Sequence, residues 1–228
     1  MTPALSRPDL YSETEMKGKI DVAANAERKL WKRLMRAWDA GQGASHFEVA
    51  AQYTAKYPDN AFGWVALADV LVLLAHYEAA RRALSRADKL APAKLRGHIC
   101  VQWGHLFRES GDLRKAEKWY RRAVQYKANT PRLVFLGAVL AKQGRFAEAK
   151  RCHRRAARLA TTAPDEAYYN LGLILRAERR YSEALIYFKK AIKIDPKYTF
   201  AKEGVKDVRQ AIKLKAEWTL LPRARGGR

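Results

Sequence analysis

Small residues recur along this chain at a fixed helical spacing, and this repetition limits the folds that the chain can adopt. From Asp165 to Pro196 the apolar residues fall at helical intervals in two blocks, with a polar segment between them. Such a segment predicts two amphipathic helices that form a hairpin. Gly172 lies twelve residues before Ala184 and nineteen before Ala191. These small side chains predict the face on which the two helices approach closely.

The same triplet of small residues occurs three more times upstream. The copies are Gly137 with Ala149 and Ala156, Gly104 with Ala116 and Ala123, and Ala68 with Ala80 and Ala87. Successive first members lie 35, 33 and 36 residues apart. A helical hairpin that repeats about every 34 residues resembles the tetratricopeptide repeat (TPR) family, here over residues 61–196. The resemblance implies an all-α fold, a right-handed α-solenoid of stacked helical hairpins, with four clear repeats at 61–197.

The copies depart from the family pattern at some positions. Ala68 stands in the first copy where a glycine is expected, and His153 stands in the third where a large apolar residue is usual. We expect a slightly irregular superhelix and an intact fold.

The segments outside the four repeats predict the two ends of the array. Residues 1–16 lack a period and predict a disordered tail. Residues 17–60 predict amino-terminal helices that include a degenerate repeat, because Pro58 lies 34 residues before Pro92. Residues 198–218 predict one basic helix that caps the last repeat through an apolar stripe. Residues 219–228 predict a disordered basic tail.

The resemblance implies that the first helix of each hairpin lines a concave groove. The residues expected there are Phe62, Val65, Asp69, His98, Val101, His105, Arg108, Val134, Ala138, Lys142, Tyr169, Leu173 and Arg176. This mainly apolar lining suits an extended peptide or an amphipathic helix of a protein partner. The same side chains could instead pack against a neighbouring repeat or the chain's own amino terminus. The residues that clamp a terminal carboxylate in chaperone-binding relatives have no counterpart, so we do not expect chaperone tails as ligands.

Charge is distributed unevenly along the chain. Lys and Arg number 45 against 23 Asp and Glu, a formal net charge of +22, and residues 93–228 alone hold 32 basic against 12 acidic side chains. Candidate polyanion-binding residues on the second helices and the last helix are Arg121, Arg122, Arg154, Arg155, Lys189, Lys190, Lys202, Lys206, Arg209 and Lys213. Stacking predicts a basic outer stripe that could hold RNA or DNA by counterion release. The alternative is a surface that only keeps the chain soluble.

The sequence contains little that is typical of a catalytic or metal-binding site. His98 and His105 are expected to face the groove and Cys100 the hairpin interior, which leaves at most two metal ligands. No glycine-rich phosphate loop, nucleophile elbow or carboxylate pair is apparent. We therefore expect no enzyme activity, no cofactor and no metal, and two reduced thiols at Cys100 and Cys152. The start of the chain lacks a signal pattern and its longest apolar run is too short to span a bilayer, so we expect a cytoplasmic protein.

These observations together favour a non-catalytic adaptor or scaffold. Its groove would bind a segment of a partner protein, and its basic carboxyl-terminal half would contact acidic partners. The alternative hypothesis is an RNA-binding or ribosome-associated protein that uses the outer stripe as its main site. The sequence does not identify the partner or the oligomeric state.

Overall fold

The computed structural model describes residues 22–41, 43–160 and 164–220, and within them the chain forms eleven α-helices and no strand. The helices are α1 (Val22–Asp39), α2 (Gly43–Lys56), α3 (Ala61–Leu73), α4 (Tyr77–Leu90), α5 (Ala93–Glu109), α6 (Leu113–Tyr126), α7 (Thr130–Lys142), α8 (Phe146–Leu159), α9 (Asp165–Ala177), α10 (Tyr181–Ile194) and α11 (Thr199–Leu220). Residues 219 and 220, expected in a disordered tail, belong to α11. The tail predicted at 1–16 and the remainder of the one at 219–228 lie outside the described residues.

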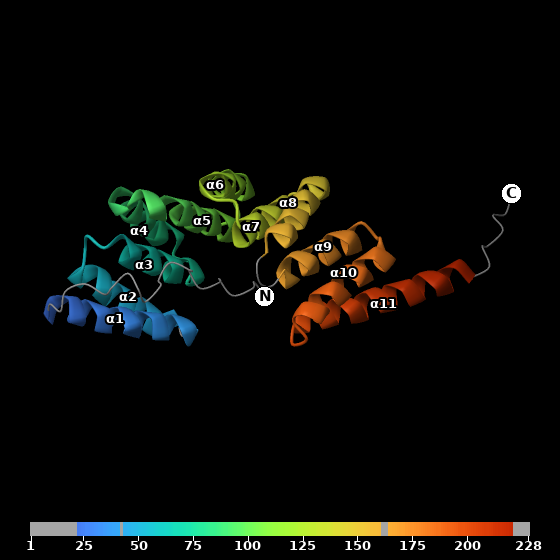
Figure 1. The fold of residues 1–228 in the computed structure, drawn as a ribbon, viewed down its shortest axis with the longest axis horizontal. Coiled ribbons are helices and arrows are strands. Elements are labelled where there is room, and N and C mark those ends of the chain that lie inside the picture. Colours follow the sequence, from blue (N-terminus) through green and yellow to red (C-terminus); the bar gives the residue numbers. More distant parts are fainter. Residues whose placement is uncertain (1–21, 42, 161–163, 221–228) are drawn as a thin grey trace.

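The helices pair into five hairpins, α1–α2 to α9–α10, and α11 packs on the last of them. Figure 1 shows the hairpins stacked into an arch, with α4, α6 and α8 on its outer side and α3, α5, α7 and α9 on the inner side. First helices of neighbouring repeats lie side by side, as α3 does with α5 and α9 with α11. The all-α solenoid expected from the repeat spacing is confirmed.

Glycine holds the two helices of a hairpin close together. A Cβ placed on Gly172 would lie 2.6 Å from Cδ1 of the fully buried Phe188. At Gly137 the facing ring is His153, whose Nε2 would lie 2.6 Å from such a Cβ. A side chain at either position would collide with an aromatic ring of the second helix, so the recurring glycine follows from the helix spacing.

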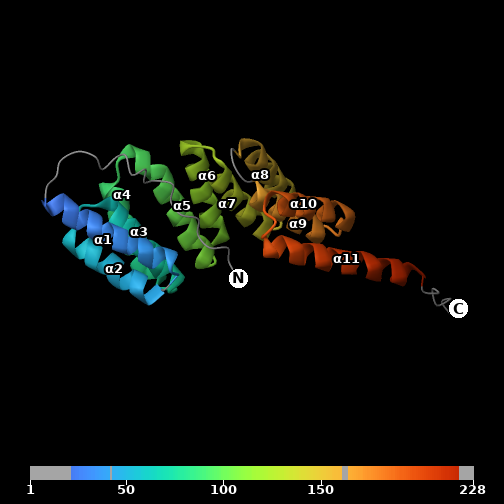
Figure 2. The same ribbon diagram turned by 60° about the horizontal axis from the view of Figure 1, so that its bottom comes forward.

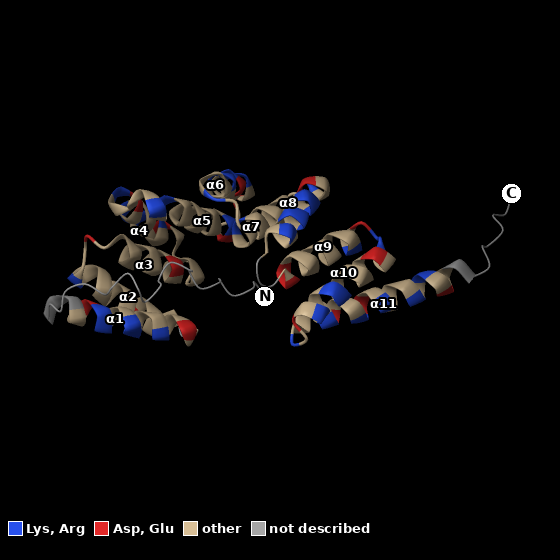
Figure 3. Cartoon of the chain, in the orientation of Figure 1, with Lys and Arg blue, Asp and Glu red and all other residues tan. Residues whose placement is uncertain are grey.

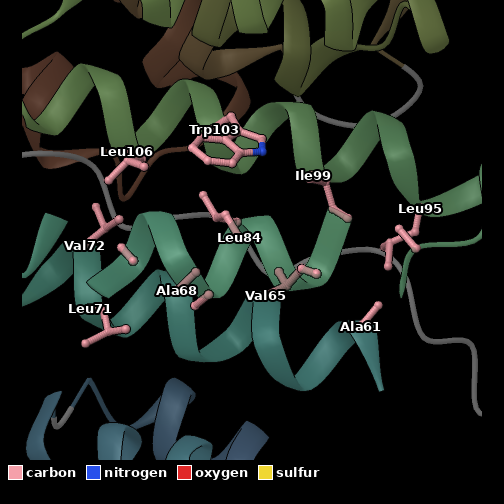
Figure 4. Packing of buried hydrophobic residues seen from close by; sticks show 14 residues of the cluster. Ala61, Val65, Ala68, Leu71, Val72, Leu84, Leu95, Ile99, Trp103 and Leu106 are labelled. Carbon is pink, nitrogen blue, oxygen red and sulfur yellow. The ribbon is translucent and has the colours of Figure 1, made fainter. Parts of the chain in front are cut away.

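Buried apolar side chains join each hairpin to the next. Figure 4 shows Ile99, Trp103 and Leu106 of α5 packed over Val65 and Val72 of α3. Comparable clusters continue along the stack, so the core is a series of interfaces between neighbours. This arrangement is typical of solenoids, in which each repeat contacts only adjacent ones.

Charged side chains also connect repeats at the outer face. Arg145, in the turn before α8, donates from Nη1 to Glu117 Oε2 at 2.7 Å and from Nε to Glu148 Oε1 at 2.7 Å. Arg121 of α6 contacts the same two carboxylates, with its Nη2 2.8 Å from Glu117 Oε1 and 3.1 Å from Glu148 Oε2. The four side chains form a network that ties α6 to α8.

Among the described helices, none combines the length and the apolar character that crossing a membrane requires.

Candidate functional site

The inner face of the arch is the first candidate site, since all thirteen expected groove residues lie on its first helices α3, α5, α7 and α9. Five of these residues are nevertheless buried, which leaves their side chains almost no surface for a ligand. They are Val65, Asp69, Val101, His105 and Val134. For these five, the expectation of a ligand-lining side chain is corrected, because contacts between adjacent helices cover them.

A buried polar cluster explains the position of Asp69. Gln102 Nε2 of α5 donates to Asp69 Oδ2 of α3 at 3.1 Å and lies 3.2 Å from His98 Nε2. Burial raises the pKa of Asp69 well above its usual range, and burial together with the nearby Arg132 lowers the pKa of His98 to about 4. Both groups therefore favour their neutral forms. The cluster joins α3 to α5, and this part of the inner face is used for packing.

His105 is likewise committed to internal contacts. Its Nδ1 lies 2.8 Å from the Tyr120 hydroxyl, and its ring meets Phe135 of α7 edge-on at a centroid distance of 4.6 Å. Burial holds the pKa of His105 well below its usual value. The neighbouring Arg108, whose side chain is 9% exposed, forms an ion pair with Glu109 at 2.7 Å.

The accessible part of the inner face lies in its carboxyl-terminal half. Ala138, Tyr169 and Leu173 are half-buried, and Lys142 and Arg176 are exposed. Phe62 and His98 are half-buried further toward the amino terminus. The Tyr169 ring also contacts Tyr198 and Phe200, at centroid distances of 5.2 and 6.5 Å. Phe200 is 42% exposed. The periodicity did not single out these two residues, which extend the apolar surface of α9 onto the start of α11.

The cations of the second helices and of α11 are the second candidate site. All ten expected polyanion-binding residues are exposed, on α6, α8, α10 and α11, and Figure 3 shows Lys and Arg along α8 in particular. Arg121 is tied to Glu117 and Glu148, so its charge is largely neutralised within the fold. Arg122 lies over the Trp119 ring at 5.4 Å, and Lys190 lies over the Tyr187 ring at 5.1 Å. These two cations stay accessible beside a partly exposed aromatic ring.

Acidic and basic residues are separated along the second helices. Glu117, Glu148 and Glu183 occupy the first halves of α6, α8 and α10, and no acidic residue follows them within these helices. The remaining halves hold only cations among their charged residues, including Arg154 and Arg155. The carboxyl-terminal half of each of these three helices is thus free of carboxylates.

Within the three described ranges, no group of three His, Cys, Asp or Glu side chains comes together in a way that could hold an ion. Cys100 is buried, as expected from its interior position, and Cys152 is half-buried, both as free thiols. Burial raises the pKa of both thiols, which disfavours the reactive thiolate.

Comparison with known proteins identifies the repeats. Models of the tetratricopeptide repeat match residues 97–130 and 128–197. No curated protein matches the chain significantly in sequence.

Solved structures of other TPR proteins resemble the fold. TTC0263, a thermophilic TPR protein of Thermus thermophilus, aligns with a TM-score of 0.67 and 18% identity over 81% of this chain and 99% of its own. YrrB, a TPR protein with an unusual peptide-binding site, aligns with a TM-score of 0.56 and 18% identity over 82% of this chain and 98% of its own. Yeast Tom70 aligns at 0.67 and 14% identity over 89% of this chain and 45% of its own. At such identities the likeness concerns the fold alone.

Proposed function

Because the chain belongs to the tetratricopeptide repeat family, whose fold supports protein–protein interaction, we propose that it is a non-catalytic adaptor that binds a segment of a partner protein on its inner face. The observation that carries this proposal is the open apolar surface formed by Tyr169, Leu173 and Phe200. These side chains come from the neighbouring helices α9 and α11, and we call the three of them the strip.

An extended peptide or an amphipathic helix suits such a strip. Either ligand presents apolar side chains at regular intervals, and aromatic or aliphatic anchors that fill partly open sites contribute much of the affinity in such complexes. Toward the amino terminus the inner face is used for packing, since Asp69 of α3 is buried against Gln102 of α5 and His105 is buried against Tyr120. The binding segment is therefore expected over α7, α9 and the start of α11, and not over α3.

The groove proposal is tested by selecting random peptides on the immobilised chain and measuring their affinity by fluorescence anisotropy. Phe200→Asp is expected to weaken binding of the enriched peptides about tenfold or more, since it places a charge in an apolar contact. Leu173→Ala, which removes apolar surface without adding charge, is expected to weaken it less. Ile186→Asp is the matched control, because Ile186 is 53% exposed on α10, outside the strip.

Failure of the selection to enrich any peptide would contradict the groove function. Equal losses of peptide affinity in Phe200→Asp and Ile186→Asp would also contradict it. Circular dichroism melting curves of all three variants exclude unfolding as the cause of a loss.

A second surface is proposed for acidic partners at the carboxyl-terminal halves of α6, α8 and α10, with RNA or a ribosome as the alternative main partner. The separation of charge along α6, α8 and α10 favours this candidate, because a row of cations without interspersed carboxylates suits a polyanion. Binding of a labelled single-stranded RNA is expected to fall steeply with salt and to weaken in Arg154→Glu/Arg155→Glu. Arg81→Glu/Arg82→Glu, an equal charge change on the exposed face of α4, is the control. Equal losses of RNA affinity in both double variants would show that binding depends only on the net charge of the chain.

A further inference from the structure

One face of α6 alternates cations and aromatic rings. Lys115, Trp119, Arg122 and Tyr126 follow one another at steps of four, three and four residues, which places them in one stripe along the helix. Lys115, Arg122 and Tyr126 are exposed, and Trp119 is half-buried. Figure 2 shows α6 beside α5, its partner in the hairpin. We call these four side chains the α6 stripe.

A buried ring holds the Trp119 side chain in place. Trp119 stacks on Trp103 of α5, with a centroid distance of 5.4 Å and an angle of 16° between the rings. Trp103, labelled in Figure 4, is buried and also stacks on Phe107 at 5.9 Å. Because Trp119 is already fixed by this contact, a ligand that stacks on it costs the side chain little further freedom.

The charges of the stripe favour an anion at Arg122. Its Cζ lies 5.4 Å from the centroid of the Trp119 ring, and it forms no ion pair within the described residues. Lys115, in contrast, is paired with Asp112 at 2.8 Å. Glu117, the only acidic residue of α6, is already neutralised by the network with α8. The stripe therefore presents an unpaired cation between two aromatic side chains.

The two rings have no full counterpart in the neighbouring second helices. Trp119 and Tyr126 stand three and ten residues after the buried alanine at 116, and equivalent alanines lie at 80, 149 and 184. The residues at the equivalent positions are Ala83 and Leu90 in α4, Cys152 and Leu159 in α8, and Tyr187 and Ile194 in α10. Smaller side chains thus satisfy the packing at these positions elsewhere, so packing alone does not account for both rings of α6.

We propose that the α6 stripe binds a single-stranded nucleic acid, with bases stacked on Trp119 and Tyr126 and a phosphate at Arg122. This inference rests on the second surface proposed above and names its partner. The two rings are seven residues apart, about 10 Å along the helix axis, so they contact different bases of one strand. A single strand is required, because a duplex keeps the faces of its bases stacked inside.

The rings favour a nucleic acid over an acidic segment of a protein. The face of an aromatic ring carries negative partial charge, so it stacks on the flat face of a base but does not attract a carboxylate. Arginine guanidinium planes stack on bases as well. An acidic peptide would use only the cation, whereas a nucleic acid uses the cation and both rings.

The test compares two labelled strands that carry the same number of phosphates. One is a single-stranded RNA of adenine nucleotides, and the other is an abasic strand of equal length. We expect anisotropy titrations to show about tenfold or more tighter binding of the strand with bases, because each stacked base adds to the affinity. Tryptophan fluorescence should be quenched by this strand and not by the abasic one.

Tyr126→Leu is expected to weaken binding of the adenine strand about tenfold and to leave the affinity for the abasic strand unchanged. Leucine stands at the equivalent position of α4 and α8, so the fold accommodates it. Phe47→Leu is the matched control, because it removes an exposed aromatic ring on α2, away from the stripe. Arg122→Gln is expected to weaken binding of both strands and to reduce its salt dependence.

The outcomes separate this inference from the proposed second surface. Equal affinities for the two strands, or equal effects of Tyr126→Leu and Phe47→Leu, overturn the inference and leave a surface that binds polyanions through charge alone. A polyglutamate peptide that binds more tightly than the adenine strand overturns the assignment to a nucleic acid. An absence of binding to both strands contradicts the RNA alternative for the second surface as well.

Discussion

His153 packs directly against Gly137, and neither nitrogen of its ring has a hydrogen-bond partner in the described structure. The side chain is fully buried, in the place that Tyr120 and Phe188 fill in the repeats on either side. Burial lowers the pKa of His153 to about 4, so the ring is neutral at physiological pH. A buried polar ring without hydrogen-bond partners destabilises the core around it.

Replacing His153 with Phe is therefore expected to stabilise the chain. The ring size is nearly kept and the cost of two unsatisfied nitrogens is removed, which amounts to about 1 kcal/mol or more. Thermal unfolding should show a melting temperature about 2–4 °C higher. His76→Phe, at an exposed turn position, serves as the control and should leave the melting temperature unchanged. A lower melting temperature for His153→Phe would mean that the ring nitrogens have partners.

Stability is expected to fall as the pH drops from about 6.5 toward 4. Burial lowers the pKa of His46, His98 and His153 to about 4, below the usual 6.5. In this window the unfolded chain binds protons that the folded chain excludes, and one such histidine costs on the order of 2 kcal/mol by pH 5. Asp69 acts in the opposite sense, because its raised pKa lets the folded chain bind a proton first.

Urea unfolding at a series of pH values measures this slope. His153→Phe should have a shallower slope than the unaltered chain over the same window, since one of the contributing groups is gone. Identical slopes would contradict the low pKa of His153.

Gly172→Ala is expected to destabilise the fourth repeat. The added methyl would lie 2.6 Å from Phe188 Cδ1, and overpacking of this kind costs about 1–3 kcal/mol. Gly43→Ala is the matched control, because a Cβ there would lie 3.5 Å from Leu74 Cδ2, an ordinary contact. The midpoints of urea unfolding are compared between the two variants. Equal midpoints would show that Phe188 moves aside without a loss of stability.

Glu117→Gln is expected to weaken the link between α6 and α8. The carboxylate accepts from Arg121 and Arg145, and its side chain is only 13% exposed, so its loss should cost about 1 kcal/mol at low salt. Glu78→Gln, whose carboxylate is 78% exposed and 3.8 Å from Arg81, should cost nothing measurable. The difference between the two variants is measured by urea unfolding. A difference that persists undiminished at high salt would argue against an electrostatic origin.

The repeat spacing was enough to predict the hairpins, because the contact between Gly172 and Phe188 depends on residues of one hairpin. The groove was harder to predict, because its surface depends on contacts between hairpins. His105 has the same position in its repeat as the half-buried Leu173, but Phe135 of the next repeat covers it. The spacing of residues within one repeat does not determine how closely the first helix of the following repeat packs over it.

The surface charges could likewise be predicted only in part from the sequence. The exposure of Arg154 and Arg155 followed from helical spacing alone. The pairing of Arg121 with Glu117 could have been anticipated from their separation of four residues. Its second partner, Glu148, lies 27 residues away and becomes a neighbour only when α6 and α8 stack.

The separation of charge along α6, α8 and α10 has a consequence for the whole molecule. The cations in the carboxyl-terminal halves of these helices, with Glu117, Glu148 and Glu183 in the other halves, separate charge along each helix, in addition to the net charge of +22. In the field of a negatively charged body the chain rotates during approach, so that these carboxyl-terminal halves lead. Orientation before contact raises the rate of productive encounters, and that rate falls steeply as ionic strength increases.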